Sequence, residues 1–267
     1  MIQVVVCGAT GKMGRRIIAC AAEDADIKIV GAVDRKDNPD IGKDSGELSG
    51  CAKNSVPISG DLAAVIDGAD VVIDFSFHEA TVDVAECCKK NKKPLVIGTT
   101  GFSTQELEKV KANADSIALL IAPNMSIGAN VLFHKAGEIA RILGDDYDIE
   151  IIEAHHKFKK DAPSGTANKI AEVLAEARGS DIEKCGVYGR KGDNALRNKE
   201  DIGVHVVRGG DIIGEHTVLY CGMGERIELS HKASTRDNFA KGALRAVKYL
   251  KDAAPGIYDM GDVLSLK

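Results

Sequence analysis

The chain has 267 residues, of which 44% are hydrophobic and 28% charged, with 28 Gly and only 6 Pro. This composition is typical of a globular protein and excludes a disordered, collagen-like or coiled-coil chain. Because 35 Lys and Arg face 40 Asp and Glu, the formal net charge is −5, and only 4% of residues are aromatic. We therefore expect no nucleic acid and no anionic membrane as partner, and any bound anion must be held by local positive charge.

The sequence predicts a cytoplasmic protein. Met1-Ile2-Gln3 leads directly into an apolar segment, without a basic leader or cleavage site, and no run of about 18 apolar residues occurs. Seven cysteines lack CxxC or Cys/His metal spacing, so we expect neither disulfides nor a bound metal. Cys7 and Cys20 lie in apolar patterns and are interpreted as core thiols.

Strands and helices are expected to alternate in the first half of the chain. The predicted strands are 2–7, 27–33, 71–75, 95–97 and 117–121, and the predicted helices are 15–22, 61–66, 79–90 and 103–112. Ser103 is the expected N-cap of the last helix. Repeated βαβ units of this kind predict a parallel, doubly wound sheet of Rossmann type.

The pattern changes after residue 124. We expect helices at 127–142, 165–177 and 238–251, and strands at 148–153, 202–207, 212–220 and 225–231. The last three strands alternate at period 2 around the turns Arg208-Gly209-Gly210-Asp211 and Cys221-Gly222-Met223-Gly224, which predicts hairpins in a mixed, largely antiparallel sheet. The sequence therefore predicts two domains, one at 1–126 and a smaller α+β domain at 127–236. The pattern leaves open to which of the two domains the last helix belongs.

A glycine-rich turn follows the first strand and opens the first helix. Gly8-Ala9-Thr10-Gly11-Lys12-Met13-Gly14 has GxxGxxG spacing, in which glycines permit close backbone approach and the helix start attracts a pyrophosphate. Asp34 ends the second strand, where a carboxylate accepts hydrogen bonds from the ribose hydroxyls, and Arg35 next to it can pair with a 2′-phosphate or lie against adenine. The pattern predicts binding of NADH, NADPH or both.

Two further segments follow predicted strands at the edge where a ligand lies in an open α/β sheet. They are Gly98-Thr99-Thr100-Gly101 and Ala122-Pro123-Asn124-Met125, and we expect both to border the nicotinamide.

A basic cluster precedes the helix predicted at 165–177. Five of the six residues from 155 to 160 are His or Lys, and Pro163-Ser164-Gly165-Thr166 follows as a helix start with Ser164 as its cap. Amides of Gly165 and Thr166 beside cations make a pocket for one or two carboxylates. A lysine among other cations has a lowered pKa and can deliver a proton, and His155 can shuttle a proton. Lys159 is preferred as the donor over Lys157 and Lys160, although sequence position alone does not separate the three.

These motifs together resemble the dihydrodipicolinate reductase family, whose members act on 4-hydroxy-tetrahydrodipicolinate. The resemblance spans nearly the whole chain, and its most specific part is the pattern His-His-x-x-Lys-x-Asp-Ala-Pro-Ser-Gly-Thr-Ala from His155 to Ala167. Supporting segments are 8–14, 98–102, 124–130 and 231–236. Met125 replaces a frequent Phe and Asp34 a frequent Glu, changes that bear on nicotinamide packing and on the balance between NADH and NADPH.

The resemblance implies reduction of a cyclic dicarboxylate by NAD(P)H with loss of water, in lysine and diaminopimelate biosynthesis. It implies that His155 and Lys159 are catalytic and that His156, Gly165 and Thr166 contact the substrate. It also implies that 1–126 is a dinucleotide-binding domain, on which the C-terminal segment 237–267 packs back. The domain at 127–236 would then serve substrate binding and oligomerisation, and a homotetramer would assemble through its sheets. The cofactor contacts that it implies are Gly8, Ala9, Thr10, Gly11, Lys12, Met13, Asp34, Arg35, Gly98, Thr99, Thr100, Ala122, Pro123, Asn124 and Met125.

Two other functions remain as alternatives. An amino-acid semialdehyde dehydrogenase needs a nucleophilic cysteine, for which only Cys7 and Cys221 lie near strand ends, and neither has an evident base nearby in sequence. A nucleotide-sensing protein without catalysis would keep the first domain but would have no use for the basic cluster.

Overall fold

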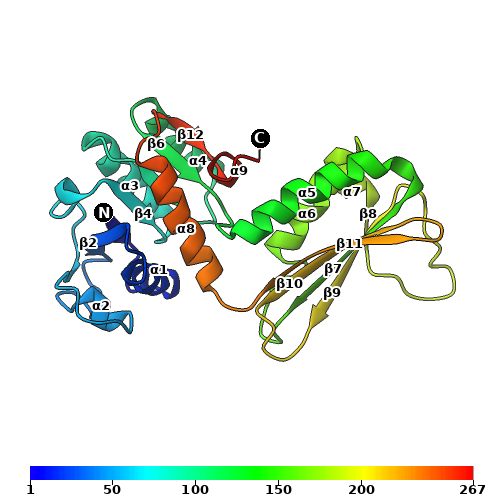
Figure 1. Cartoon of the computed structure of the whole chain (residues 1–267), viewed down its shortest axis with the longest axis horizontal. Coiled ribbons are helices and arrows are strands. Elements are labelled where there is room, and N and C mark those ends of the chain that lie inside the picture. The colour runs from blue at the N-terminus through cyan, green and yellow to red at the C-terminus, as the bar shows by residue number, and fades with distance from the viewer. Residues whose placement is uncertain (267) are drawn as a thin grey trace. The chain divides into compact units, whose positions relative to one another are not determined.

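The computed structural model describes residues 1–266, which form two compact units. Unit 1 comprises Met1–Ile127 and the segment from Arg236 onward, and unit 2 comprises Gly128–Thr235. Each unit has its own sheet, and helices pack on each sheet (Figure 1). In the part of the chain that is described, no helix is both long and apolar enough to cross a membrane.

Unit 1 contains a parallel sheet of seven strands within residues 1–266, in the order β12-β6-β5-β4-β1-β2-β3. The strands are β1 (Ile2–Cys7), β2 (Ile27–Val33), β3 (Ile58–Ser59), β4 (Val71–Asp74), β5 (Leu95–Ile97), β6 (Ala118–Ile121) and β12 (Gly256–Tyr258). The helices are α1 (Lys12–Ala22), α2 (Ser45–Leu48), α3 (His78–Lys90), α4 (Thr104–Lys111), α8 (Asp237–Leu250) and α9 (Met260–Val263). The predicted Rossmann-type sheet is confirmed.

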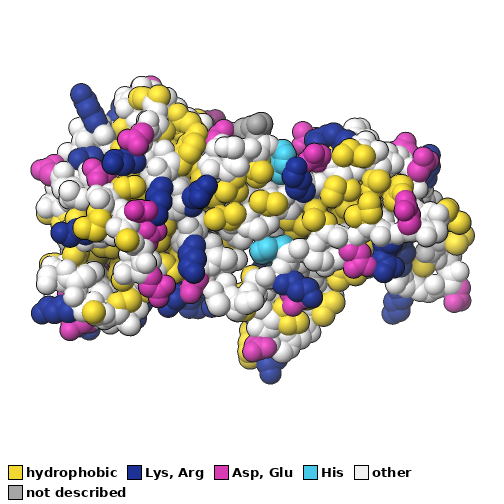
Figure 2. Space-filling model, viewed as in Figure 1, with side chains coloured by type: hydrophobic (Ala, Val, Ile, Leu, Met, Phe, Trp, Pro, Cys, Tyr) yellow, Lys and Arg dark blue, Asp and Glu magenta, His cyan; other side chains and the backbone are white. Residues whose placement is uncertain are grey.

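The sheet of unit 1 is buried on both faces, as a continuous apolar strand such as β1 requires. One core cluster joins β1 to α1 and α8, and a second joins the other face to α3 and α4. Cys7 and Cys20 are buried free thiols, as predicted. Acidic and basic side chains are interspersed on the visible surface (Figure 2), in agreement with the small net charge.

Unit 2 contains a mixed sheet in the order β11-β10-β7-β9-β8. Its strands are β7 (Asp148–His155), β8 (Gly186–Tyr188), β9 (Ile202–Arg208), β10 (Gly214–Cys221) and β11 (Arg226–Ala233), and its helices are α5 (Ile127–Leu143), α6 (Gly165–Ala177) and α7 (Ile182–Cys185). Helices α5 and α6 share a core cluster with one face of the sheet. Along β7 buried and more exposed side chains alternate, so the opposite face is open.

Two expectations about local structure are wrong. Residues 61–66 form a turn that leads into the short 3₁₀ helix Ile66–Gly68 instead of an α-helix, and within this turn the Asp61 carboxylate accepts from the N–H of Ala63. The strands β9 and β10 do not form a hairpin: β7 lies between them, antiparallel to β10 and parallel to β9. The alternating pattern gave each strand correctly, but the order of strands depends on β7, which lies far away in the sequence.

Candidate active site

The glycine-rich turn of unit 1 has a backbone that only glycine permits. Gly8 has a φ of +74°, and a Cβ on it would lie 2.4 Å from the carbonyl oxygen of Phe75. A Cβ on Gly14 would lie 2.1 Å from the carbonyl oxygen of Gly8. Helix α1 then begins at Lys12, and its N-cap Gly11 supplies no side-chain hydrogen bond to the helix amides. The start of α1 therefore keeps its positive end accessible to an anion, as the dinucleotide prediction requires.

Asp34 connects the end of β2 to this turn. Its Oδ2 accepts hydrogen bonds from the backbone N–H and the hydroxyl of Thr10, at 2.9 and 2.7 Å, and its Oδ1 accepts from the N–H of Arg35 at 2.9 Å. Burial acts against the charged form, but these hydrogen bonds together hold the pKa of Asp34 below its usual value. Asp34 is therefore an ionised acceptor placed beside the turn, and the Arg35 side chain is largely exposed.

The segment after β5 is anchored by a buried carboxylate that the sequence analysis did not single out. Asp74, at the end of β4, is fully buried and accepts hydrogen bonds from the hydroxyls of Ser76, Thr81 and Thr99 at 2.6, 2.5 and 2.9 Å. Burial raises the pKa of Asp74, although these hydroxyls oppose the rise. The hydroxyl of Thr99 is therefore turned inward, toward Asp74.

The residues expected to border the nicotinamide are placed differently from one another. The Phe75 ring packs on Gly98, where a Cβ would lie 2.1 Å from it. Ala122 and Met125 are buried, and Met125 belongs to the core cluster that includes α8. Met125 therefore packs in the core of unit 1, and its contact with the nicotinamide stays a prediction. Pro123 is exposed and Asn124 half-buried.

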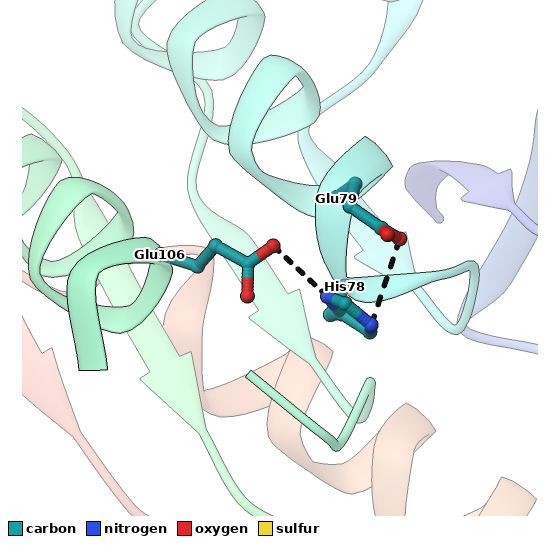
Figure 3. Close-up of side chains that lie close together, drawn as sticks. All are labelled: His78, Glu79 and Glu106. Carbon is teal, nitrogen blue, oxygen red and sulfur yellow. Dashed lines mark hydrogen bonds and ion pairs between the residues drawn. The ribbon is translucent and has the colours of Figure 1, made fainter. Parts of the chain in front are cut away.

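Helix α3 begins with a group that has the composition of a metal site. His78, Glu79 and Glu106 lie close together (Figure 3). The Nδ1 of His78 lies 2.9 Å from Glu106, and its Nε2 lies 3.6 Å from Glu79. One ligand atom from each of the three lies within 4.8 Å of the others, and Glu106 already pairs with the His78 ring. Glu106 also closes a capping box with Ser103, which confirms the predicted cap of α4 and holds the pKa of Glu106 at about 2.

In unit 2 the predicted His155 ends β7 and is oriented by Glu153. The Nδ1 of His155 lies 2.6 Å from Oε2 of Glu153, whose side chain is 0% exposed. Arg208, at the end of β9, donates to both oxygens of this carboxylate at 2.8 and 2.9 Å, and the N–H of Ser164 donates to it at 2.9 Å. We refer to Glu153, His155, Ser164 and Arg208 as the Glu153 cluster.

Helix α6 begins beside the Glu153 cluster. The hydroxyl of Ser164 caps the N–H of Ala167 at 3.2 Å, which confirms the predicted N-cap. Gly165 is exposed at the first position of the helix, where a Cβ would meet no atom within 4 Å. His156 is half-buried, and its Nδ1 has no hydrogen-bond partner in residues 1–266. A carboxylate ligand would complement both the positive start of α6 and the unpaired ring nitrogen of His156.

Among the three lysines considered for proton donation, Lys159 is the one turned inward. Its side chain is 21% exposed and its Nζ lies 2.8 Å from Asp161, whereas Lys157 and Lys160 are exposed. The sequence argument considered only cations around Lys159, and the structure adds this carboxylate. Lys159 and its partner belong to the loop between β7 and α6, which Arg208 holds by donating to the carbonyl oxygen of Asp161.

Sequence reasoning missed three residues of this region: Glu153, Arg208 and His216. His216 lies directly opposite Glu153 on β10, and its Nε2 is 3.0 Å from the Ser164 hydroxyl. Burial, and then the neighbouring His155, lower the pKa of His216 to about 4, so this ring is neutral at pH 7. A carboxylate two residues before the end of β7 and an arginine at the end of β9 were the available signal, but only the register of the sheet brings them together.

The chain is similar to known proteins along almost its whole length. Residues 2–125 match the family described as "Dihydrodipicolinate reductase, N-terminus", and residues 128–264 match "Dihydrodipicolinate reductase, C-terminus". The chain is 48% identical to a 4-hydroxy-tetrahydrodipicolinate reductase of Syntrophus aciditrophicus and 50% identical to one of Geotalea daltonii, each over 267 residues and 100% of both chains.

A solved structure is also similar along the chain. It is the dipicolinate-bound dihydrodipicolinate reductase of Paenisporosarcina sp. TG-14, with a TM-score of 0.77 and 27% identity, over 97% of this chain and 97% of that chain. Because both family matches together span nearly all residues and the curated relatives match over their full length, the chain belongs to the dihydrodipicolinate reductase family.

Proposed function

We propose that this chain reduces 4-hydroxy-tetrahydrodipicolinate to tetrahydrodipicolinate with NADH or NADPH, in the pathway to diaminopimelate and lysine. One hydride and one proton enter the ring system, and the hydroxyl group leaves as water. The observation that carries the proposal is that one small region of unit 2 holds His155, His156 and Lys159 beside the start of α6, in a chain of this family.

The residues of unit 1 fit a dinucleotide. The backbone at Gly8 and Gly14 leaves no room for a side chain, and the start of α1 is open to a pyrophosphate. Asp34 is ionised and beside this turn, so it can accept the ribose hydroxyls, and the exposed Arg35 can meet adenine or a 2′-phosphate. When bound, the reduced nicotinamide supplies the hydride.

In unit 2 the residues of the chain hold the substrate and the proton. The amides of Gly165 and Thr166 and the ring of His156 bind a carboxylate of the substrate, and the dipole of α6 favours its charge. Lys159 is the proton donor, and His155 stabilises or relays charge. Asp161 fixes the Lys159 ammonium group within the loop.

The semialdehyde dehydrogenase alternative is disfavoured by the cysteines. Burial raises the pKa of the Cys7 thiol well above its usual value, and Cys7 is 2% exposed, so a reactive thiolate is excluded at that position. The non-catalytic alternative is disfavoured by the intact cluster around His155.

Assembly and location are part of the proposal. The open face of the sheet in unit 2 exposes apolar side chains such as Ile152 and Val207, and we propose that copies of the chain cover this face in a homotetramer. We place the protein in the cytoplasm, where this biosynthetic reaction finds its cofactor. Analytical ultracentrifugation tests the assembly, and a monomer at micromolar concentration would contradict it.

The test of the function is oxidation of NADH, or of NADPH, with the condensation product of pyruvate and aspartate semialdehyde. We expect turnover with the wild type and a fall in kcat of about 100-fold or more in Lys159→Ala. The affinity of that variant for NADH, measured by fluorescence titration, should stay unchanged. Lys157→Ala and Lys160→Ala are matched controls, because both lysines lie in the same loop but are exposed. Binding of NADH without turnover in the wild type would instead support a sensing role.

A further inference from the structure

The carboxylate of Glu153 is surrounded by donors on both oxygens. Oε1 accepts from the N–H of Ser164 and from Nη2 of Arg208, both at 2.9 Å. Oε2 accepts from Nη1 of Arg208 at 2.8 Å and faces Nδ1 of His155 at 2.6 Å. Each oxygen therefore has one contact to Arg208 and one contact to an element of the proposed site.

The same contacts keep Glu153 ionised although it is fully buried. Burial raises the pKa of Glu153, but hydrogen bonds from Arg208, His155 and Ser164 outweigh burial and hold it below the usual value. An ionised carboxylate only accepts hydrogen bonds. The nitrogen of His155 that faces it must therefore carry a hydrogen, which leaves Nε2 as the nitrogen that can accept a proton in the neutral ring.

We propose that Glu153 is a positioning residue, which fixes His155 in the tautomer protonated on Nδ1 and holds the start of α6 beside it, while Arg208 completes the carboxylate's shell. The inference rests on the proposed function for the role of His155, but the contacts of Glu153 do not depend on it. The Glu153 carboxylate contacts both His155 and the start of α6. It therefore fixes the distance between the ring that handles the proton and the helix start that binds the substrate.

A glycine supports this arrangement. A Cβ on Gly214 of β10 would lie 3.0 Å from Nε2 of His155, so the absence of a side chain there leaves room for the ring that Glu153 orients. The groups that face His155 are Glu153 on its own strand, Arg208 on β9, His216 on β10 and Lys159 in the loop. Among these, Glu153 is the anion, and its removal should lower the pH at which His155 gains a proton.

The experiment compares Glu153→Gln with a matched control, Glu150→Gln. Glu150 lies three residues earlier on β7 and contacts two arginines and a histidine, Arg190, Arg197 and His205. The glutamine side chain replaces one carboxylate oxygen by an NH₂ group, which cannot accept a hydrogen bond from any of the four donors around it. We therefore expect the Nδ1 tautomer of His155 to be lost. The readouts are the nitrogen-15 spectrum of the histidine rings, the pH midpoint of His155, kcat and the affinity for NADH.

For Glu153→Gln we expect a change of tautomer, a lower pH midpoint and a fall in kcat of about 100-fold, with NADH affinity unchanged. Glu153→Asp keeps the charge and should recover the tautomer and part of kcat, which a purely structural role would not predict. Glu150→Gln should leave the spectrum of His155 as in the wild type.

Several results would overturn the proposal. One is a wild-type His155 protonated on Nε2 alone, which needs no variant and remains decisive if Glu153→Gln does not fold. Another is an unchanged tautomer and pH midpoint in Glu153→Gln. If the wild type shows no turnover but its tautomer depends on Glu153, the proposed function fails and the positioning role stands.

Discussion

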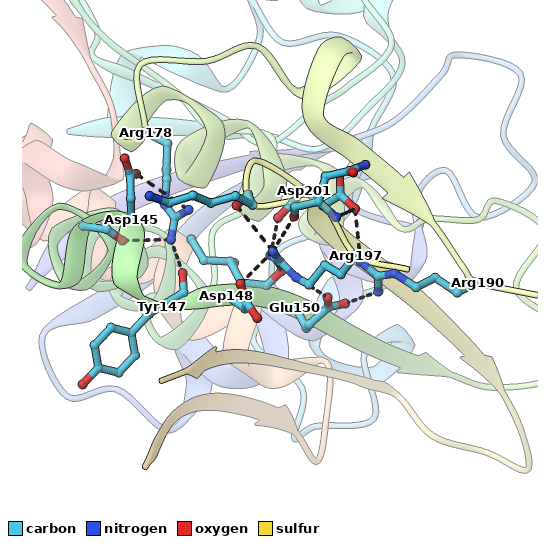
Figure 4. A network of polar contacts seen from close by, with 12 residues as sticks. Asp145, Tyr147, Asp148, Glu150, Arg178, Arg190, Arg197 and Asp201 are labelled. Atoms are coloured by element: carbon cyan, nitrogen blue, oxygen red, sulfur yellow. Dashed lines mark hydrogen bonds and ion pairs between the residues drawn. The ribbon is translucent and has the colours of Figure 1, made fainter. Parts of the chain in front are cut away.

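Strand β7 carries two glutamates with the same kinds of partner on opposite faces of one sheet. Glu150 contacts Arg190 at 2.9 Å, Arg197 at 3.2 Å and His205 at 2.6 Å, and we refer to these four residues as the Glu150 cluster. Figure 4 shows Glu150 with the two arginines. The Glu153 cluster has an arginine and a histidine around its carboxylate too. The side chain of Glu150 is 16% exposed and that of Glu153 is 0% exposed.

The two clusters differ in what their partners belong to. Arg190 and Arg197 come from the segment between β8 and β9, and Arg197 also contacts Asp148 and Asp201, so the Glu150 cluster ties a connecting segment to the sheet (Figure 4). Glu153 instead holds the loop before α6, the helix start and His155. The difference teaches that a glutamate, arginine and histidine in contact do not by themselves mark a functional site: burial and the elements they join decide the role.

The largest effect that would sharpen this comparison is expected from removing one arginine of each cluster. Arg208→Met leaves the buried Glu153 without its cation and should cost about 3–5 kcal/mol, because an uncompensated buried charge is strongly unfavourable. Arg190→Met leaves Glu150 with Arg197 and partial access to water, so about 1 kcal/mol is expected. Native-state hydrogen exchange of the β7 amides measures both. Equal costs would show that burial does not distinguish the clusters.

A second prediction concerns acid. An unfolded histidine has a pKa of about 6.5, and that of His216 is lowered to about 4. Between these values the unfolded chain binds a proton that the folded chain does not, so stability falls as the pH drops through this window, by about 3 kcal/mol. His216→Gln should remove that part of the slope in the free energy of unfolding against pH.

The Glu150 cluster should respond in a different pH window. Although burial opposes the change, Arg190 and His205 lower the pKa of Glu150 from its usual 4.5. Its stabilisation is therefore complete above pH 4.5 and is lost as the pH falls through the lowered pKa. Glu150→Gln should change the slope only below pH 4.5. An identical slope between pH 4.5 and 6.5 in the wild type and His216→Gln would refute the assignment to His216.

Effects smaller than the loss of Arg208 are expected at one glycine beside each cluster. Gly214→Ala puts a methyl group 3.0 Å from His155 Nε2, so the ring must shift and kcat should fall by about tenfold, with about 1 kcal/mol lost. Gly203→Ala places a Cβ 1.7 Å from the carboxylate of Glu150, which must move away from its cations. That variant should lose about 1–3 kcal/mol with kcat per folded enzyme unchanged. Thermal unfolding and steady-state kinetics separate the two, and a reversed pattern would contradict the assignment of roles.

The sequence was sufficient where local chemistry determines the structure. Ser103 and Ser164 were predicted as caps because their hydroxyls act within one helical turn, and both caps are present. The buried parallel strands followed from their apolar runs. The short strand β3 and the strand order around β7 were not predicted, because two-residue elements have no periodicity and strand order depends on distant partners.

The same limit applies to the site. His155 and Lys159 were predicted within one short motif, whereas Glu153 received no role although it stands two residues from His155. Its partners Arg208 and Ser164 lie 55 and 11 residues away, and Arg208 was assigned only to a turn. A buried carboxylate becomes interpretable only when the donors that neutralise it are known, and the sheet register supplies them.

The three hydroxyls gathered on Asp74 have a consequence for the motion of unit 1. Ser76 lies in the segment after β4, Thr81 in the first turn of α3 and Thr99 in the segment after β5. Release of any one hydroxyl leaves the buried carboxylate of Asp74 with too few hydrogen-bond donors, which is unfavourable. The three segments therefore form one cooperative unit of local unfolding. A cofactor that restricts the motion of the backbone near Thr99 therefore also restricts the motion of the first turn of α3, because Asp74 binds both segments.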